Sequence, residues 1–344
     1  MNADWQTTLG ALGARINDGK VCDFGDPEGE LIAARDASIV APLTQFNLIG
    51  CAGEDAKSFL HNQLTSDVNH LEAANAQYSA WCSPKGRMLA SFVLFRRELN
   101  NTGYLALLSA DLREFIQKRL QVYVLRSKVK ISEYSADYEI IGLSGPQAVS
   151  ALQNAGLEAP AVAMAATGFT DASVIRLDDK RYIVVAASGP AARIWRQLAA
   201  IATPVGAPVW QWLDLAAGIP WITGATKEAF VPQMVNFDKI GGVSFHKGCY
   251  PGQEVVARAR YLGKIKRHLY RARAASPITA GMSIFSSQTP DQSCGQIANA
   301  AAAPGGGFDA LAVILEEAIG KDGLCVTSPD GCAIGLSNLN PVGG

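Results

Sequence analysis

The segment Phe46–Ala56 reads FNLIGCAGEDA, and the segment Tyr138–Ala148 reads YEIIGLSGPQA. Each is an apolar run of strand length that ends in a glycine-containing turn. A stretch with helical spacing follows each of them, up to Leu64 in the first copy and to about Leu157 in the second. The repetition predicts that one strand–turn–helix unit occurs twice in the chain.

A second pair of segments extends this repeat. Tyr104–Ser109, with a helix predicted over 111–121, corresponds to Tyr182–Ala187, with a helix predicted over 190–201. The resulting order of strand, helix, strand, strand and helix is that of the split βαβ unit of ferredoxin-like folds. The sequence therefore predicts an α+β protein with two such units related by pseudo-symmetry.

Beyond Arg267 the pattern changes to short extended runs that proline and glycine separate. These runs are His268–Ala274, Met282–Phe285, Gly295–Ala302, Ala310–Glu316 and Leu324–Thr327. Short strands with regularly spaced turns predict a separate C-terminal β-barrel. We expect Asn338–Gly344 to form a loose tail.

The composition is that of a globular protein. The chain has 344 residues, of which 49% are hydrophobic and 18% charged, so it can form two or three domains with substantial cores. Its net charge of −1 argues against binding nucleic acid over its whole surface. The start lacks the pattern of a signal peptide, and no run reaches the length of a membrane span, so we expect a cytoplasmic protein without a membrane partner.

The cysteines do not suggest a metal site. They are odd in number, widely spread and without any C-x-x-C pair, so neither a disulfide framework nor a zinc or cluster site is indicated. The seven positions are Cys22, Cys51, Cys82, Cys249, Cys294, Cys325 and Cys332.

Cys249 lies in the segment Lys247–Glu254, which reads KGCYPGQE. Glycine and proline so close together predict a loop that presents side chains in fixed directions. Lys247, Arg258 and Arg260 are near in sequence and should favour the thiolate, so Lys247 and Cys249 are candidates for chemistry. A lone cysteine can equally be a small buried apolar residue. Of the four histidines, His246 alone is near Cys249 in the sequence.

Two residues at the end of this segment carry hydrogen-bonding groups suited to a ligand. Gln253 can donate and accept, and Glu254 can accept from an amidine edge such as that of a pterin. The alternative is that both cap the strand or loop that follows.

The octapeptide and two preceding segments, Phe230–Asp238 and Gly241–Phe245, resemble the signature of the folate-binding YgfZ family. That signature is K-G-C-[F/Y]-x-G-Q-E preceded by PQxxN and GGxSF. Matches also occur at Gln63–Val68, Cys82–Arg87 and Gly218–Pro220, so the resemblance spans most of the chain up to about residue 275.

The resemblance implies a fold and a function, because this family is related to the T-protein (aminomethyltransferase) of the glycine cleavage system. It implies a three-domain cloverleaf around a central folate channel, with domains over 1–45 plus 136–262, over 46–135 and over 263–344. It also implies that the protein binds tetrahydrofolate or a one-carbon derivative. The implied role is in making or repairing iron–sulfur enzymes, including those that modify transfer RNA, with iron–sulfur client or assembly proteins as partners.

Aromatic residues are candidate folate contacts. Trp210 and Trp212 could stack on a pterin or benzoyl group, although tryptophan commonly fills cores. The resemblance places Phe46 at an aromatic wall of the channel. T-protein relatives usually carry an arginine and a glutamate where this chain has Asp214 and Ala216, so the pterin clamp differs here.

Basic residues crowd the segment that follows the octapeptide. Their alternation fits the solvated face of strands, which is the first interpretation. The second is an anionic folate tail held by residues such as Arg258, and the third is RNA, so we do not expect direct RNA binding. The basic residues are Arg258, Arg260, Lys264, Lys266, Arg267, Arg271 and Arg273.

The segment Lys85–Phe92 separates two functional hypotheses. T-proteins carry aspartates after a Gly-Gly here, whereas this segment reads KGRMLASF and has no carboxylate. Transfer of a one-carbon group needs a residue that manages protons at the folate nitrogens. We therefore favour an accessory protein over a turnover enzyme, and a folate-dependent aminomethyl- or methyltransferase is the alternative.

Overall fold

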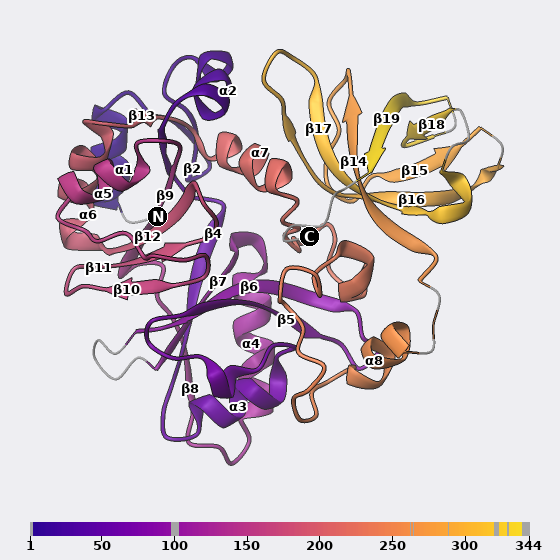
Figure 1. Cartoon of the computed structure of the whole chain (residues 1–344), viewed down its shortest axis with the longest axis horizontal. Helices are drawn as coiled ribbons and strands as arrows, with labels where there is room; N and C mark the ends of the chain where they lie inside the picture. The colour runs from indigo at the N-terminus through magenta and orange to yellow at the C-terminus, as the bar shows by residue number, and fades with distance from the viewer. Residues whose placement is uncertain are drawn as a thin grey trace. The chain divides into compact units, whose positions relative to one another are not determined.

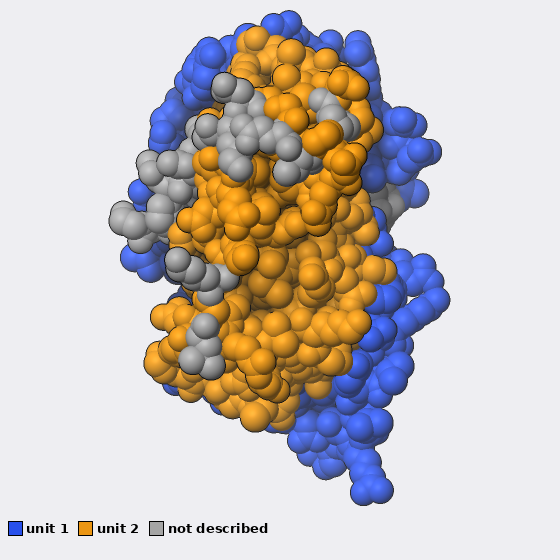
Figure 2. Space-filling model, turned by 90° about the vertical axis from the view of Figure 1, so that its right-hand side faces the viewer, with its two compact units in different colours: residues 1–60, 68–77, 92–210 blue, residues 61–67, 78–91, 211–344 orange. Residues whose placement is uncertain are grey.

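The computed structural model describes residues 3–97, 103–261, 263, 265–287, 289–319, 323–328 and 330–338. The chain forms two compact units, which are coloured separately in Figure 2. Unit 1 comprises residues 1–60, 68–77 and 92–210, and unit 2 comprises residues 61–67, 78–91 and 211–344. The three-domain division drawn from the sequence stays a prediction.

The first copy of the repeat forms a sheet with the strand order β5-β6-β7-β4-β8 (Figure 1). Its apolar runs form strands, and the residues of these strands are almost all buried, as in Phe46–Ala52 and Met88–Arg96. The elements are β4 (Phe46–Ala52), α3 (Ala56–Gln63), β5 (Ala76–Cys82), β6 (Met88–Arg96), β7 (Tyr104–Ser109), α4 (Arg113–Val124) and β8 (Lys130–Glu133).

The second copy forms a sheet with the order β10-β11-β12-β9-β3-β13. Here β9, whose residues are all buried, pairs antiparallel with both β12 and β3. The elements are β3 (Ile39–Pro42), β9 (Tyr138–Ser144), α5 (Ala148–Asn154), β10 (Ala166–Gly168), β11 (Ala172–Arg176), β12 (Arg181–Ala187), α6 (Ser188–Ala199) and β13 (Thr203–Pro204).

The two sheets repeat one strand order, since β5-β6-β7-β4 in the first corresponds to β10-β11-β12-β9 in the second. Within the described ranges, three strands lie between the two helices of each copy, whereas the sequence analysis expected two. The additional strands are the hairpin partners β5 and β10. The structure is thus a mixed α/β fold, while the ferredoxin-like units and the cloverleaf stay predictions.

Aromatic packing organises the core of the second copy. Trp195 on α6 is fully buried, and its ring centroid lies 5.7 Å from that of Trp5 and 5.8 Å from that of Phe24. Trp210 is also fully buried, and a Cβ added to Gly142 of β9 would lie 2.5 Å from its ring. Gly142 is therefore needed where the ring of Trp210 approaches the sheet.

The predicted C-terminal barrel is confirmed, with the closed strand order β14-β17-β16-β15-β18-β19. Its core includes Ile284, Ile297 and Ile314. The strands are β14 (Arg267–Ala274), β15 (Ser283–Ser286), β16 (Thr289–Ala302), β17 (Phe308–Leu315), β18 (Leu324–Val326) and β19 (Cys332–Asn338). The sequence analysis missed β19, which closes the barrel by pairing with β14. Of the expected tail, only Asn338 falls within the described residues, and it ends β19.

The remaining elements lie outside these three sheets. They are α1 (Ala3–Ala11), β1 (Arg15–Asn17), β2 (Lys20–Asp23), α2 (Pro27–Asp36), α7 (Ala207–Ala217), α8 (Gln253–Tyr261) and the 3₁₀ turns Val68–His70, Ala110–Leu112, Pro232–Val235 and Glu316–Ala318. Across the described part of the chain, every helix is too short or too polar to cross a bilayer.

Candidate functional site

The segment Lys247–Glu254 forms a loop that leads into helix α8. Gly252 has a φ of +78°, and a Cβ added there would lie 2.4 Å from the carbonyl oxygen of Ser83. A Cβ added to Gly86, whose φ is +70°, would in turn lie 2.8 Å from the Cβ of Val255. The expectation that glycine permits a turn and a close approach therefore holds at Gly252.

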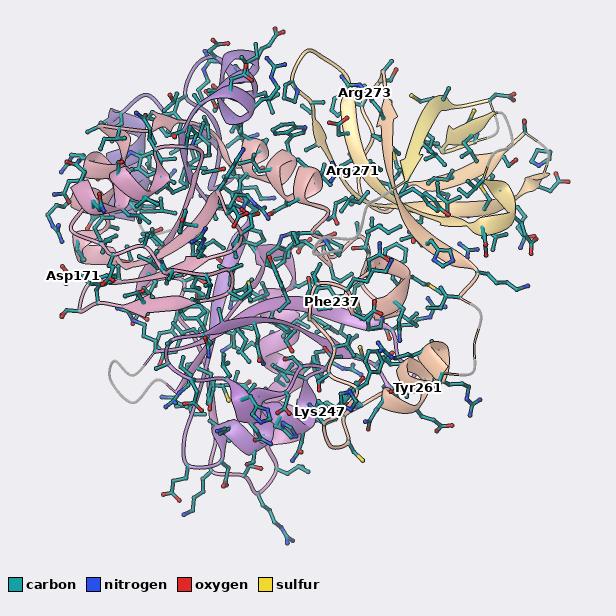
Figure 3. The ribbon with its side chains drawn as sticks, viewed as in Figure 1. Asp171, Phe237, Lys247, Tyr261, Arg271 and Arg273 are labelled. Carbon is teal, nitrogen blue, oxygen red and sulfur yellow. The ribbon has the colours of Figure 1, made fainter. Side chains whose placement is uncertain are left out.

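Lys247, labelled in Figure 3, fastens this loop to the end of helix α3. Its side chain is buried, and its Nζ donates hydrogen bonds to the carbonyl oxygens of His61 and Leu64, the latter at 2.5 Å. A cation is favourable at a helix C-terminus, where the last carbonyls have no partner within the helix. The ammonium also lies 5.1 Å from the ring centroid of Tyr250. The charge of Lys247 is thus directed at backbone oxygens and an aromatic face.

Burial changes the titration of Lys247. Desolvation lowers the pKa of its ammonium to about 8, and the negative charge of Asp67 opposes this shift. The two hydrogen bonds to carbonyl oxygens replace part of the lost hydration.

His61 and Asp67 lie beside the same loop. His61 Nδ1 is 3.2 Å from Asp67 Oδ1, and their side chains are 12% and 23% exposed. A Cβ added to Gly248 would lie 3.7 Å from His61 Nε2, so the imidazole faces the residue that precedes Cys249. Neither residue was predicted from the sequence to belong to the site. Their position within or next to the matching segment Gln63–Val68 was the available signal.

The buried hydroxyl group of Thr65 joins segments that match the family signature. The side chain of Thr65 is fully buried, donates to the carbonyl oxygen of Gly242 at 2.6 Å and accepts from the amide of Ala80 at 2.9 Å. The amide of Ser244 donates to the carbonyl oxygen of Thr65 at 2.9 Å. The structure thus brings together segments about 180 positions apart in the sequence that the family resemblance had singled out separately.

Cys249 itself is exposed, while Cys51 and Cys82 are buried. Burial raises the pKa of the thiols of Cys51 and Cys82 to about 12. Cys249 is therefore far more accessible to a reagent than these two cysteines.

The residues after Gly252 form helix α8, so the expected alternation of Arg258 and Arg260 on a strand is wrong. Glu254 in the first turn and arginines in the last turn suit the helix dipole, which explains why this polar stretch is helical. Glu254 Oε1 accepts from Arg258 at 2.7 Å, and these side chains are 83% and 66% exposed. Gln253 begins the helix instead of capping a strand. Ligand roles for Gln253, Glu254 and Arg258 stay predictions.

Phe46 and Trp210 both lie in unit 1. Phe46 is buried and lines a small cavity of about 30 Å³ together with Trp5 and Tyr138. Trp210 has no exposed surface, and the guanidinium of Arg181 lies 6.0 Å from its ring centroid. The indole of Trp210 packs as a core residue, and a folate contact by either residue stays a prediction.

Trp212, in contrast, lines a cavity of about 320 Å³ within unit 2. Its indole Nε1 donates to Asp309 Oδ2 at 2.9 Å, and Arg273 donates to Asp309 Oδ1 at 3.0 Å. Arg271 donates to the carbonyl oxygen of Ala216. Figure 3 labels both arginines on β14. The other lining residues are Leu215, Ala272, Ala310, Gly335 and Leu336.

Two further residues that the sequence singled out are Asp214 and Lys264. Asp214 is buried and accepts a hydrogen bond from Trp221 Nε1 at 3.0 Å, so it has a structural partner. Lys264 lies outside the described residues. Over the described ranges, no group of three or more His, Cys, Asp and Glu side chains is arranged to hold a metal ion.

Comparison with known proteins defines the class of the fold. Residues 24–169 match the family described as "GCVT N-terminal domain". The crystal structure of glycine cleavage system aminomethyltransferase T from Bartonella henselae aligns with 99% of this chain and 98% of that one, at a TM-score of 0.75 and 17% identity. The chain therefore has the aminomethyltransferase-like fold.

Curated relatives define the family within this class. The tRNA-modifying protein YgfZ of Enterobacter sp. (strain 638) is 33% identical over 71% of this chain and 74% of its own length. The protein of the same name from Colwellia psychrerythraea is 33% identical over 66% of this chain and 69% of its own. The chain belongs to the YgfZ family, which confirms the resemblance drawn from the octapeptide.

The buried Lys247 predicts a pH-dependent stability. Its pKa in the folded protein, about 8, lies below the ordinary value of 10.5, so the unfolded chain binds more protons between these values. The unfolding free energy of wild type should therefore rise relative to that of Lys247→Met as the pH increases from 8 to 10, by up to about 1.4 kcal/mol per pH unit. Urea denaturation of both proteins at several pH values measures the difference. If the difference in unfolding free energy between the two proteins stays constant or falls as the pH rises, the pKa of Lys247 is not lowered by burial.

Proposed function

We propose that this protein binds tetrahydrofolate or a one-carbon derivative. We further propose that it is an accessory protein in the synthesis or repair of iron–sulfur enzymes, including enzymes that modify transfer RNA. The cavity beside Trp212 is the observation that carries the folate part. Membership of the YgfZ family, whose curated relatives are named tRNA-modifying proteins, supports the second part.

The cavity has the groups that a folate needs. A pterin offers a flat apolar ring and an amidine edge that donates hydrogen bonds, and the glutamate end offers carboxylates. The indole of Trp212 suits the ring, and the carboxylate of Asp309, which Arg273 holds at 3.0 Å, suits the amidine edge. A volume of about 320 Å³ is within the range of small-molecule sites.

Asp309 retains the capacity to accept from a ligand. Each of its oxygens takes one protein hydrogen bond, from Trp212 and from Arg273, whereas a carboxylate can accept about four. Ala216, at the position where T-protein relatives usually carry a glutamate, also lines this cavity. We infer that Asp309 on β17 supplies the carboxylate that the helix does not.

We also propose the arrangement of domains that the family resemblance implies. It includes a cloverleaf of domains over 1–45 plus 136–262, over 46–135 and over 263–344 around a central folate channel. Iron–sulfur client or assembly proteins in the cytoplasm are the proposed partners. Cys249 is the proposed reactive group, since it is exposed on a loop that Lys247 and two glycines hold in place.

The region near Arg87 supports the accessory role over the alternative aminomethyl- or methyltransferase. Arg87 donates to the carbonyl oxygens of Glu228 and Ala229, so its side chain is directed at backbone. Ser91 accepts from the amide of Ile222 at 2.9 Å. Neither Arg87 nor Ser91 provides a carboxylate that could manage protons at a folate nitrogen.

Folate affinity should depend on the Trp212 cavity. Trp212→Ala should weaken tetrahydrofolate binding about 5- to 150-fold, because stacking of a base on an aromatic ring contributes about 1–3 kcal/mol. Arg273→Gln should weaken it about 3- to 10-fold through loss of a partly exposed charge contact. Isothermal titration with tetrahydrofolate measures both.

Arg193→Gln is the matched control for Arg273→Gln. Arg193 is also 54% exposed and also pairs with an aspartate, Asp171, at 3.0 Å, but it lies on α6 and is not among the residues that line this cavity. Figure 3 labels Asp171. The folate assignment to this cavity is wrong if Trp212→Ala binds like wild type, or if the two arginine variants lose equal affinity.

The thiol of Cys249 should be required in cells. Cys249→Ser keeps the size of this exposed side chain, so the variant should fold and bind tetrahydrofolate. It should nevertheless fail to restore iron–sulfur enzyme activities in cells that lack the protein, because the hydroxyl cannot replace thiolate chemistry. Complementation at matched expression levels tests this. Full restoration by Cys249→Ser would assign the thiol a structural role.

The purified protein should not act as an aminomethyltransferase. With an aminomethylated lipoyl donor and tetrahydrofolate, it should release no ammonia above background, because no carboxylate is present in Lys85–Phe92. An ammonia assay measures this. Turnover on the order of 1 per second or faster would instead establish the transferase.

A further inference from the structure

The end of helix α4 exposes apolar side chains (Figure 1). Val122 is 70% exposed and Leu125, which follows the helix, is 87% exposed, while Tyr123 between them is 36% exposed. The buried face of this helix carries Ile116 and Leu120, and Val122 lies two residues, or about 200°, beyond Leu120. The core of unit 1 therefore gains little from apolar side chains at Val122 and Leu125.

The backbone at Leu125 is one that leucine rarely adopts. Leu125 has a φ of +45° and a ψ of −108°, close to the first central position of a type II′ turn, where glycine is preferred. The amide of Ser127 closes this turn by donating to the carbonyl oxygen of Val124 at 2.8 Å. A Cβ is disfavoured at such torsions, and a strained residue that packs against little of its own fold indicates a role in binding.

The same turn borders a depression of about 720 Å³ on the surface of unit 1. A flat bilayer surface cannot fill a hollow of this kind, whereas a protruding segment of another protein can. The depression therefore favours a protein partner over a membrane. The residues that line it are Asp55, Tyr123, Val124, Leu125, Arg126 and Ser127.

The charges around the depression favour an acidic partner. Arg119, one turn before the exposed valine of α4, and Arg126, in the lining, are both exposed. Lys128 pairs with Glu54 at 2.7 Å, and its backbone amide donates to Asp55 Oδ2 at 2.7 Å. These three cations exceed the two carboxylates by one, so a positive charge stays available to a partner. A second copy that presents the same surface would bring the same excess charge, which disfavours pairing of two copies here.

We propose that Val122, Leu125 and Arg126 form a docking surface for a partner protein, whose binding segment combines apolar and acidic side chains. Its apolar groups cover Val122 and Leu125, and a carboxylate of the segment pairs with Arg126. The inference rests on the proposed accessory role, which requires a partner protein, and it adds the surface that binds this partner.

Leu125→Gly tests whether the fold itself needs this leucine. Glycine adopts the observed torsions without strain, and the lost side chain packs against little of the protein, so the melting temperature should rise by about 2–6 °C. Thermal unfolding of the full chain, followed by circular dichroism, measures the shift. A lower melting temperature would assign Leu125 a structural role and overturn the inference.

Photo-crosslinking in cells tests the partner. The probe is p-benzoylphenylalanine in place of Val122, and the matched control carries the probe in place of Val162, which is 65% exposed and also lies in unit 1. Mass spectrometry of the adduct at position 122 should identify a protein segment with acidic and apolar residues. Leu125→Gly and Arg126→Glu should each lower the yield of this adduct on the order of tenfold, since each removes a contact at the centre of the surface.

The identity of the adducts decides the outcome. Adducts to lipid, to RNA or to a second copy of this chain would overturn the inference, and so would the absence of any adduct at position 122. Equal adducts at positions 122 and 162 would also overturn it, as would a yield that neither Leu125→Gly nor Arg126→Glu changes.

Folate titration of the same purified variants separates this inference from the proposed function. The crosslinking readout does not depend on folate or on enzyme activity. A protein adduct at position 122 that both variants suppress, in a chain that fails to bind tetrahydrofolate, supports the inference and rejects the folate proposal. A chain that binds tetrahydrofolate but gives equal adducts at both positions does the reverse.

Discussion

The bond between a buried ammonium and the end of a helix is the constraint on which the candidate site depends. Lys247 places its charge on the carbonyl oxygens of His61 and Leu64, where α3 ends. These oxygens would otherwise be unsatisfied at a helix terminus. The same contact sets the position of the cysteine loop, whereas burial of the side chain lowers the pKa of the ammonium through desolvation. Lys247, a candidate for chemistry from its sequence context, is in the structure the anchor of the loop, and its chemical role stays a prediction.

Helix α7 shows how two neighbouring tryptophans acquire different roles. Residues two apart on a helix point about 200° away from each other. Trp210 is buried against Gly142, and Trp212 lines the cavity and bonds to Asp309. Both indoles have the same chemistry, so the difference comes from which face of the helix is covered by packing. This difference is why the folate proposal rests on Trp212.

Ion pairs within the protein also decide which charged side chains can interact with a ligand. Glu254 and Arg258 form an exposed pair one helical turn apart, which is worth little in stability and leaves both groups hydrated. Arg273 and Asp309 pair across β14 and β17 at the rim of a cavity. A ligand there meets one net positive charge from Arg271, Arg273 and Asp309, which favours an anion with a polar edge.

Local sequence determined the elements with strong periodicity. The repeat at Phe46 and Tyr138, the barrel beyond Arg267 and the glycine-dependent loop at Cys249 were predictable, because chain stiffness and apolar spacing are properties of adjacent residues. The family was also evident, since eight adjacent residues carry its signature. Strand β19 was not, because its sequence CAIGLSN lacks a strong apolar alternation and its pairing with β14, about 60 residues away, is not a local property.

Tertiary structure alone decided the environment of each candidate side chain. No local pattern shows that Lys247 reaches the end of α3 or that His61 faces Gly248. Each of these facts depends on segments that meet only after folding, such as Thr65 with Gly242. Burial and partner distance set the charge state and reactivity of a group. The sequence therefore identified the cysteine loop and Trp212, and the packing of distant segments added Asp309 and set the surroundings of each side chain.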